Sequence, residues 1–197
     1  MYEDLPQPSV GAINTYLPVA AQKNTLLHIR LFSLTAFMPA IITTDQVWNS
    51  IEKNFFAVLG MVTAKGEART AGVVYVARER QIYIGTSKTA WKVRHIQQNP
   101  HVSVTVTIPK RIPFLPFLPI PPAAITFQGL ALVQQQDSIE QEILEALFKG
   151  MEVDEQLIAD SCLIRIKPSG DFITYGVGVS MKTMRNPEKS HGRASVS

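Results

Sequence analysis

One short stretch of the sequence carries hydroxyl, basic and imidazole side chains between two strand-like segments: "QIYIGTSKTAWKVRHIQQNPHVSVTVTI", residues 81–108. We interpret its middle as a helix that opens on small and hydroxyl residues, namely Gly85, Thr86 and Ser87. The first turn of a helix leaves N–H groups without partners and carries partial positive charge. Basic side chains follow at positions i, i+4 and i+7 and so share one face of this helix: Lys88, Lys92 and His95. The pattern predicts an anion site, most naturally for a phosphate.

A capped surface helix with solvated lysines is the alternative interpretation, because charged stripes on helices are common. Micromolar affinity requires about 8 kcal/mol. A charge-assisted hydrogen bond contributes roughly 1.5–3 kcal/mol. A binding site therefore needs several donors and an apolar surface for the rest of the ligand, and the residue types alone leave both interpretations open.

The predicted strands on both sides of this segment determine where its side chains lie. Alternation of apolar and polar residues, which is typical of half-buried strands, marks segments on both sides of it. Turn residues separate neighbouring segments, for example Lys65-Gly66 and Pro168-Ser169-Gly170. Only one helical connection falls among the first four strands, so the pattern favours an antiparallel barrel over a doubly wound sheet. The fold class we predict is α+β, with about six strands and helices at the margins. Seven segments have strand character and supply these strands: 55–63, 68–77, 81–86, 101–108, 123–135, 161–167 and 171–177.

Two further helices and three regions complete the expected organisation. Thr43 to Phe55 is predicted as a helix because Thr43 and Gln46 have capping-box spacing. Asp137 to Lys149 is predicted as an amphipathic helix that stops at Gly150. The regions that we expect are an irregular, apolar N-terminal arm, a central barrel domain and a basic C-terminal tail: residues 1–42, 43–179 and 180–197.

Composition narrows the class of protein. The 197 residues suit one domain, and a net charge of +3 without a Lys/Arg block disfavours nucleic-acid binding. Cys162 is the only cysteine, which excludes an internal disulfide and a multi-cysteine metal site; we expect a buried, inert thiol. The four histidines show no metal-ligand spacing, so no metal is predicted. The acidic, proline-containing start disfavours a secretory signal, and the expected location is cytoplasmic.

Two apolar segments have no assigned role. The run 26–42 contains Arg30 and is too short to span a membrane comfortably. The segment 109–122 holds six prolines and cannot be regular structure. These segments either pack in a dimer or form a hydrophobic patch that makes peripheral membrane contact through residues 26–42 and 113–122.

The order of these segments resembles the pyridoxamine 5′-phosphate oxidase-like FMN-binding split β-barrel family. The matching residues are "FFAVLGMVTAKGEARTAGVVYV", "QIYIGTSKTAWKVRHIQQNPHVSVTV" and "ITFQGLALV", which cover roughly residues 50–135. The resemblance implies a split β-barrel and usually a homodimer, with a flavin at each subunit interface. The ending Arg-Leu-x-Pro, by which true pyridoxamine phosphate oxidases recognise their substrate, has no clear counterpart here. Pyridoxamine phosphate is therefore not the substrate we expect.

The resemblance also assigns residues to the flavin. It implies that a strand and the helix after the third strand hold the flavin phosphate. The strand contributes Arg69 and Thr70. The helix contributes Thr86, Ser87 and Lys92, with Lys88 as a further candidate. The backbone of Val73, Val74 and Tyr75 would run along the isoalloxazine ring. Trp91 either closes the pocket or lies in the core. The tail 180–197 either crosses to the partner's site or is solvated.

Three functions follow from this resemblance. The first is an FMN-binding oxidoreductase that transfers hydride through the flavin to an unknown small-molecule substrate. The second is a reductase that uses the deazaflavin F420. The third is a non-catalytic module that binds flavin or haem. No catalytic triad or carboxylate pair is evident, as expected where the cofactor carries the chemistry.

Overall fold

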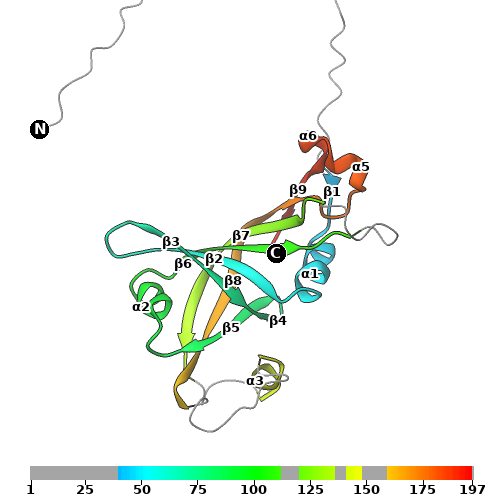
Figure 1. Ribbon diagram of the computed structural model, residues 1–197. Coiled ribbons are helices and arrows are strands. Elements are labelled where there is room, and N and C mark those ends of the chain that lie inside the picture. Colours follow the sequence, from blue (N-terminus) through cyan, green and yellow to red (C-terminus); the bar gives the residue numbers. More distant parts are fainter. Residues whose placement is uncertain (1–39, 112–119, 136–140, 148–158, 197) are drawn as a thin grey trace, which may run out of the picture. The chain divides into compact units, whose positions relative to one another are not determined.

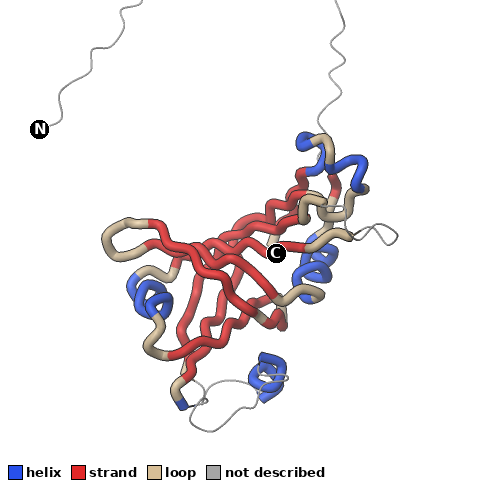
Figure 2. Tube along the Cα trace, viewed as in Figure 1, coloured by secondary structure: helices blue, strands red, loops and turns tan. Residues whose placement is uncertain are grey.

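A curled antiparallel sheet contains the strands of the described chain, with short helices at its margins (Figures 1 and 2). The computed structural model describes residues 40–111, 120–135, 141–147 and 159–196. All of them belong to one compact unit, Thr35–Ser197. The predicted α+β class and antiparallel split barrel are confirmed.

The strands are β1 (Ala40–Ile41), β2 (Phe56–Val62), β3 (Ala68–Val74), β4 (Val76–Arg78), β5 (Gln81–Ser87), β6 (His101–Ile108), β7 (Ala123–Gln134), β8 (Ser161–Tyr175) and β9 (His191–Ser195). The helices are α1 (Thr44–Glu52), α2 (Trp91–Gln98), α3 (Gln141–Leu147), α5 (Met181–Met184) and α6 (Pro187–Ser190). The described part therefore has nine strands where about six were expected.

The strand order is β1-β9-β8-β7-β6-β2-β3, and the β4–β5 hairpin joins the sheet through β5, which pairs with β8. Every pairing is antiparallel except that of β1 with β9. The fifteen residues of β8 form one strand, although we expected a turn at 168–170. Gly170 has φ +74° inside this strand, so the backbone bends there without ending the ladder.

The inner face of the sheet holds the core. Alternation along β2 and β6 sends Leu59 and Val104 inward, where both are fully buried, as is Ile125 of β7. Burial of such a side chain stabilises the fold by about 1.5–3 kcal/mol. Outward positions of the same strands, such as Gly60 and Ser103, line an open hollow described below.

Helix α1 closes one end of this core as predicted. Thr43 is its N-cap, and both hydrogen bonds of a capping box with Gln46 are present. Val47, Trp48 and Ile51 are buried against the sheet. Phe55 was expected on the same apolar face, but it lies beyond the helix and its side chain is 69% exposed.

The C-terminal segment corrects the predicted organisation. Residues 180–196 were expected either to be solvated or to reach a partner, but they form α5, α6 and β9, and β9 pairs with β8 of the same chain. The sequence suggested a tail because this segment is polar and basic. Its strand partner, β8, gives it a place at the edge of the sheet.

Several predictions fall outside the described residues. These include most of the N-terminal arm 1–42, the central part of the proline-rich segment 109–122, and both ends of the expected helix 137–149. Membrane contact through residues 26–42 and 113–122 therefore stays a prediction. Among the residues that the structure describes, no helix is long and apolar enough to cross a membrane.

Candidate functional site

The corner between β5 and α2 brings together two of the predicted phosphate ligands. Lys92 Nζ donates a hydrogen bond to Thr86 Oγ1 at 3.1 Å. Thr86 lies near the end of β5, and Lys92 is in the first turn of α2. Both side chains are half-buried. The ammonium and the hydroxyl thus form a fixed pair of hydrogen-bonding groups at the start of a helix.

The helix itself begins later than predicted. Thr86, Ser87 and Lys88 were expected in its first turn, but α2 starts at Trp91. The pairing of β5 with β8 explains the difference, because it continues to Ser87↔Ser161 and Lys88 N donates to Asp160 O at 2.9 Å. Partners far along the chain thus hold these residues extended.

A small turn fills the gap between strand and helix. The Ser87 hydroxyl lies 3.0 Å from the Thr89 hydroxyl and accepts a hydrogen bond from Thr89 N. Ala90 is the N-cap of α2 and has no side chain that could cap the helix. The N–H groups of the first turn therefore have no capping side chain, which suits an anion.

Lys88 does not share the face of Lys92. Its Nζ donates to Ala159 O at 2.6 Å, so it ties the strand end to the segment before β8. Both lysines nevertheless lie near Cys162, which pairs with Thr86 across the sheet. Burial raises the pKa of the Cys162 thiol, and the positive charges of Lys88 and Lys92 oppose this rise. Cys162 is buried, as expected for an inert thiol.

The strand-side candidates occupy a different place. Arg69 and Thr70 lie on β3 and line an open hollow of about 350 Å³ on the outer face of the sheet. Arg69 forms an ion pair with Glu67 at 2.8 Å, and both side chains are about half exposed. Solvent screening makes such a surface pair weak, so Arg69 is available to an anionic ligand.

The rest of this hollow comes from residues that we did not single out. Outward positions of β6, β7 and β8 contribute polar groups: His101, Ser103, Gln128 and Ser169. Their alternation with buried neighbours could have marked them as surface residues, but only the register of the sheet shows that they lie beside Arg69. None of the predicted residues from β5 or α2 lines the hollow.

Two glycines lie at the surface of this hollow. A Cβ added to Gly60 would collide with the Ser103 hydroxyl, and one added to Gly129 would lie 2.8 Å from Lys167 O. Both glycines line the hollow, but only the missing side chain of Gly60 opens it, because a Cβ on Gly129 would point toward the buried Ile166. A flat molecule can therefore lie against the sheet here.

The remaining candidates lie along β3 and α2. Val73 and Tyr75 are buried, whereas the side chain of Val74 is 54% exposed on the outer face. In the described chain β3 pairs only with β2, so its other edge carries backbone groups without strand partners. Trp91 is exposed and packs against His95, with ring centroids 5.6 Å apart, so the core alternative for this tryptophan is wrong.

The donor set fits a phosphorylated, planar cofactor. At the β5–α2 corner a hydroxyl, an ammonium and uncapped helical N–H groups suit a phosphate. The open sheet surface beside Arg69, to which that corner contributes no residue, suits a ring. At about 350 Å³ the hollow is near the lower limit for a drug-sized ligand, and it is open. One chain therefore supplies only part of the enclosure that such a cofactor requires.

Several solved structures are similar to this chain, and two of them, with TM-scores of 0.55, support the architecture. The haem storage protein HutZ from Vibrio cholerae is 18% identical, with 68% of this chain and 95% of HutZ covered and a TM-score of 0.55. A haem-binding protein from Mycobacterium smegmatis is 12% identical over 78% of this chain and 57% of its own, with a TM-score of 0.55. An F420 reductase is 17% identical over 63% of this chain and 93% of its own, with a TM-score of 0.47.

The match to HutZ decides the fold. The chain has the pyridoxamine 5′-phosphate oxidase-like split-barrel fold. The resemblance found in the sequence is thus confirmed at the level of the fold. Identities this low show a shared split barrel and leave the activity open. No family model matches the sequence, and no curated protein does.

Proposed function

We propose that this split barrel binds FMN and acts as a flavin-dependent oxidoreductase with a small-molecule substrate. The observation that carries the proposal is the bond between Lys92 and Thr86 beside the uncapped start of α2. An ammonium, a hydroxyl and helical N–H groups are the donors that a phosphomonoester needs. When bound, the flavin supplies the redox chemistry, and the residues of the chain bind and orient it.

The residues have separate tasks in this proposal. Thr86 and Lys92 hold the phosphate, and Ser87 keeps the turn in place through Thr89. Arg69 and Thr70 contact the cofactor from the sheet, and Val74 lies on the outer face that its ring would cover. Lys88 acts through the backbone of Ala159 and is a positioning residue.

A homodimer is the second part of the proposal, because the hollow is open and needs a cover. The outer face of β2 and β3 carries apolar and small side chains, and it exposes Phe56, Val62 and Val74. A second copy bound to this face would bury the apolar residues and form a further wall of the hollow. It would also bring the hollow of one chain close to the β5–α2 corner of the other.

F420 is the second candidate cofactor, since it also carries a phosphate and would use the same donors. The first experiment is an absorption spectrum of the purified protein, followed by mass identification of whatever denaturation releases. FMN supports the proposal, and F420 keeps the redox class but changes the cofactor. A Soret band would show haem instead. A colourless protein that also fails to bind added FMN or F420 contradicts both candidates.

Lys92→Ala tests the phosphate site directly. Loss of one charge-assisted hydrogen bond of about 1.5–3 kcal/mol should raise the dissociation constant for FMN roughly 10- to 100-fold. The measurement is a fluorescence titration of the apoprotein with FMN. Arg94→Ala is the matched control, because Arg94 is exposed on the same helix and carries the same charge. Equal affinities for the two variants would show that the assigned site is wrong.

A further inference from the structure

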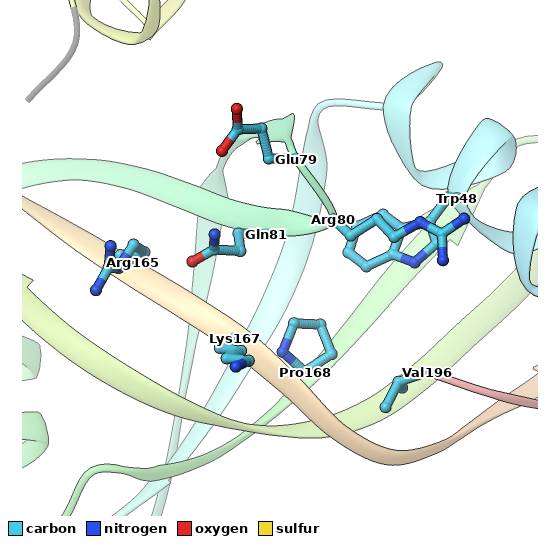
Figure 3. A pocket seen from close by; sticks show the side chains of 8 residues that line it. All are labelled: Trp48, Glu79, Arg80, Gln81, Arg165, Lys167, Pro168 and Val196. Atoms are coloured by element: carbon cyan, nitrogen blue, oxygen red, sulfur yellow. The ribbon is translucent and has the colours of Figure 1, made fainter.

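A second cavity of about 480 Å³ lies where the β4–β5 turn, β8 and α1 meet (Figure 3). Its lining includes Trp48 of α1, Arg80 and Gln81 at the turn, and Arg165 and Lys167 of β8. None of these residues belongs to the proposed FMN site. The volume is within the range of small-molecule sites.

Two cations in this cavity have no partner. Arg165 and Lys167 are two positions apart on β8, so both side chains stand on the same face of the sheet. Within the described part of the chain, neither side chain makes an ion pair or a hydrogen bond. Arg80 differs, because its guanidinium is 2.6 Å from Asp45 Oδ1. Glu79 also lines the cavity, but Figure 3 shows its carboxylate pointing away from Arg165 and Lys167.

Trp48 adds an independent observation. Its side chain is only 4% exposed and lines the cavity, and among the described residues its indole Nε1 has no hydrogen-bond partner. The indole N–H can only donate, and most buried donors in proteins are satisfied. The nitrogen itself is buried, so a ligand in the cavity would pack against the indole ring, whose environment reports on binding.

The turn beside the cavity is strained. Glu79 and Arg80 have φ of 48° and 58°, the left-handed region in which such a two-residue hairpin turn usually has Asn-Gly. Residues other than glycine and asparagine keep this strained conformation only where the surrounding structure holds them in it, and such residues are frequent at ligand sites. Here the turn and the ion pair with Asp45 fix Arg80 beside Trp48.

We propose that this cavity binds the phosphomonoester of a small hydroxylated molecule. Arg165 and Lys167 hold the phosphate, and the Trp48 indole ring packs against the rest of the ligand. Arg165, Lys167 and Trp48 all line this one cavity, so a single ligand in it can contact all three. Gln81 offers an amide to the remaining hydroxyl groups.

The test is a titration with ribose 5-phosphate at constant ionic strength, followed by the indole N–H signals in a two-dimensional ¹H–¹⁵N spectrum. The chain has two tryptophans, so Trp91→Phe leaves Trp48 as the sole indole signal. We expect a saturable shift of that signal. Because the readout is at Trp48, phosphate binding near Lys92 does not contribute to it.

Charge variants locate the phosphate. Arg165→Gln and Lys167→Gln should each weaken binding about tenfold or more. Lys65→Gln, an equal loss of charge at the exposed β2–β3 turn, should leave it unchanged, and ribose without phosphate should not bind measurably. Lys167 is exposed, so its variant remains decisive if Arg165→Gln fails to fold. An unmoved Trp48 signal, an equal shift with sodium chloride, or wild-type affinity in Lys167→Gln would each overturn the proposal.

Discussion

Tyr75 shows how a single buried hydroxyl joins helix and sheet. It follows β3, its side chain is 1% exposed, and its hydroxyl donates to Ile51 O of α1 at 2.7 Å. Both partners are shielded from water, so neither can exchange this bond for a bond to solvent. The bond therefore fixes α1 against the strand that carries Arg69 and Thr70.

Tyr75→Phe should lower the free energy of unfolding by about 1–3 kcal/mol, because the Ile51 carbonyl is left buried without its donor. Urea denaturation measures this as a lower midpoint at an unchanged slope. Tyr175→Phe is the control: its hydroxyl bond to Met184 O is longer, 3.3 Å, and half-buried. A control variant that loses as much stability as Tyr75→Phe would contradict the importance of burial.

Tyr75 also predicts how stability depends on pH. Burial raises the pKa of its phenol well above the ordinary value. The unfolded chain releases this proton near pH 10, whereas the folded chain retains it, so the folded state binds more protons above that pH. Stability should therefore be fully present below about pH 10 and fall as the pH rises. Tyr75→Phe should show a smaller fall between pH 9 and 11 in urea denaturation; parallel curves for the two proteins would exclude this cause.

Local signals predicted some elements well. The capping box of α1 involves residues only three positions apart, so sequence spacing was sufficient to find Thr43 and Gln46. Alternation likewise predicted β2, β6 and β7, because their two faces differ in burial. β3 and β5 were also predicted, although β3 is mostly exposed and β5 buries Ile82, Tyr83 and Ile84 in succession. Spacing did not predict the contact of Thr86 with Lys92, because residues six positions apart are not neighbours on a helix; only the family resemblance grouped them.

Distant partners decided the remaining features. Ser161 extends β5 through Ser87 and so delays the start of α2, and no local pattern around residue 87 reveals this pairing. The hollow beside Arg69 needs the register of five strands, which alternation does not specify. The continuity of β8 through Pro168 and Gly170 depends on the neighbouring strands in the same way.

Gly129 is a position where two strands require the absence of a side chain. An added Cβ would lie 2.8 Å from Lys167 O and from Ile166 Cγ2. Gly129→Ala should therefore force β7 and β8 apart and cost about 1–3 kcal/mol of stability. Thermal unfolding followed by circular dichroism measures the loss as a lower midpoint.

Gly85→Ala is the matched control for this change. It places the same methyl group in a strand, where the nearest atom, Leu147 Cδ1, is 3.9 Å away. Its effect should be small, since 3.9 Å is an ordinary van der Waals distance. If the two variants have similar melting temperatures, the loss of stability comes from replacing any strand glycine and not from the β7–β8 contact.

At the scale of the whole molecule, the outer face of the sheet is the surface on which the dimer proposal depends. Phe56 of β2 and Val74 of β3 are directly paired, and their side chains are 43% and 54% exposed. Large apolar side chains that gather on an exposed face mark interaction surfaces. The same face contains the hollow, so association and cofactor binding should depend on each other.

Phe56→Glu should convert a dimer to a monomer, because burying an unpaired carboxylate costs several kcal/mol. Sedimentation equilibrium at several concentrations gives the change in mass. Met181→Glu is the control, an exposed apolar residue (40%) on α5 and away from this face. A wild-type chain that is monomeric at every concentration, with or without FMN, would contradict the dimer. So would a Phe56→Glu variant that stays dimeric.

The pairing of β1 with β9 has a kinetic consequence. Ala40 lies beside Gly192, and Ile41 beside Arg193, so the first and last strands of the described chain are neighbours in the sheet. A contact between such distant segments closes a very long loop, and the entropic cost delays it until the intervening strands are in place. Refolding after dilution from denaturant should therefore end with the docking of this edge. Until that step is complete, the outer edge of β9 is open to pairing with another chain, and the refolding yield should fall as protein concentration rises.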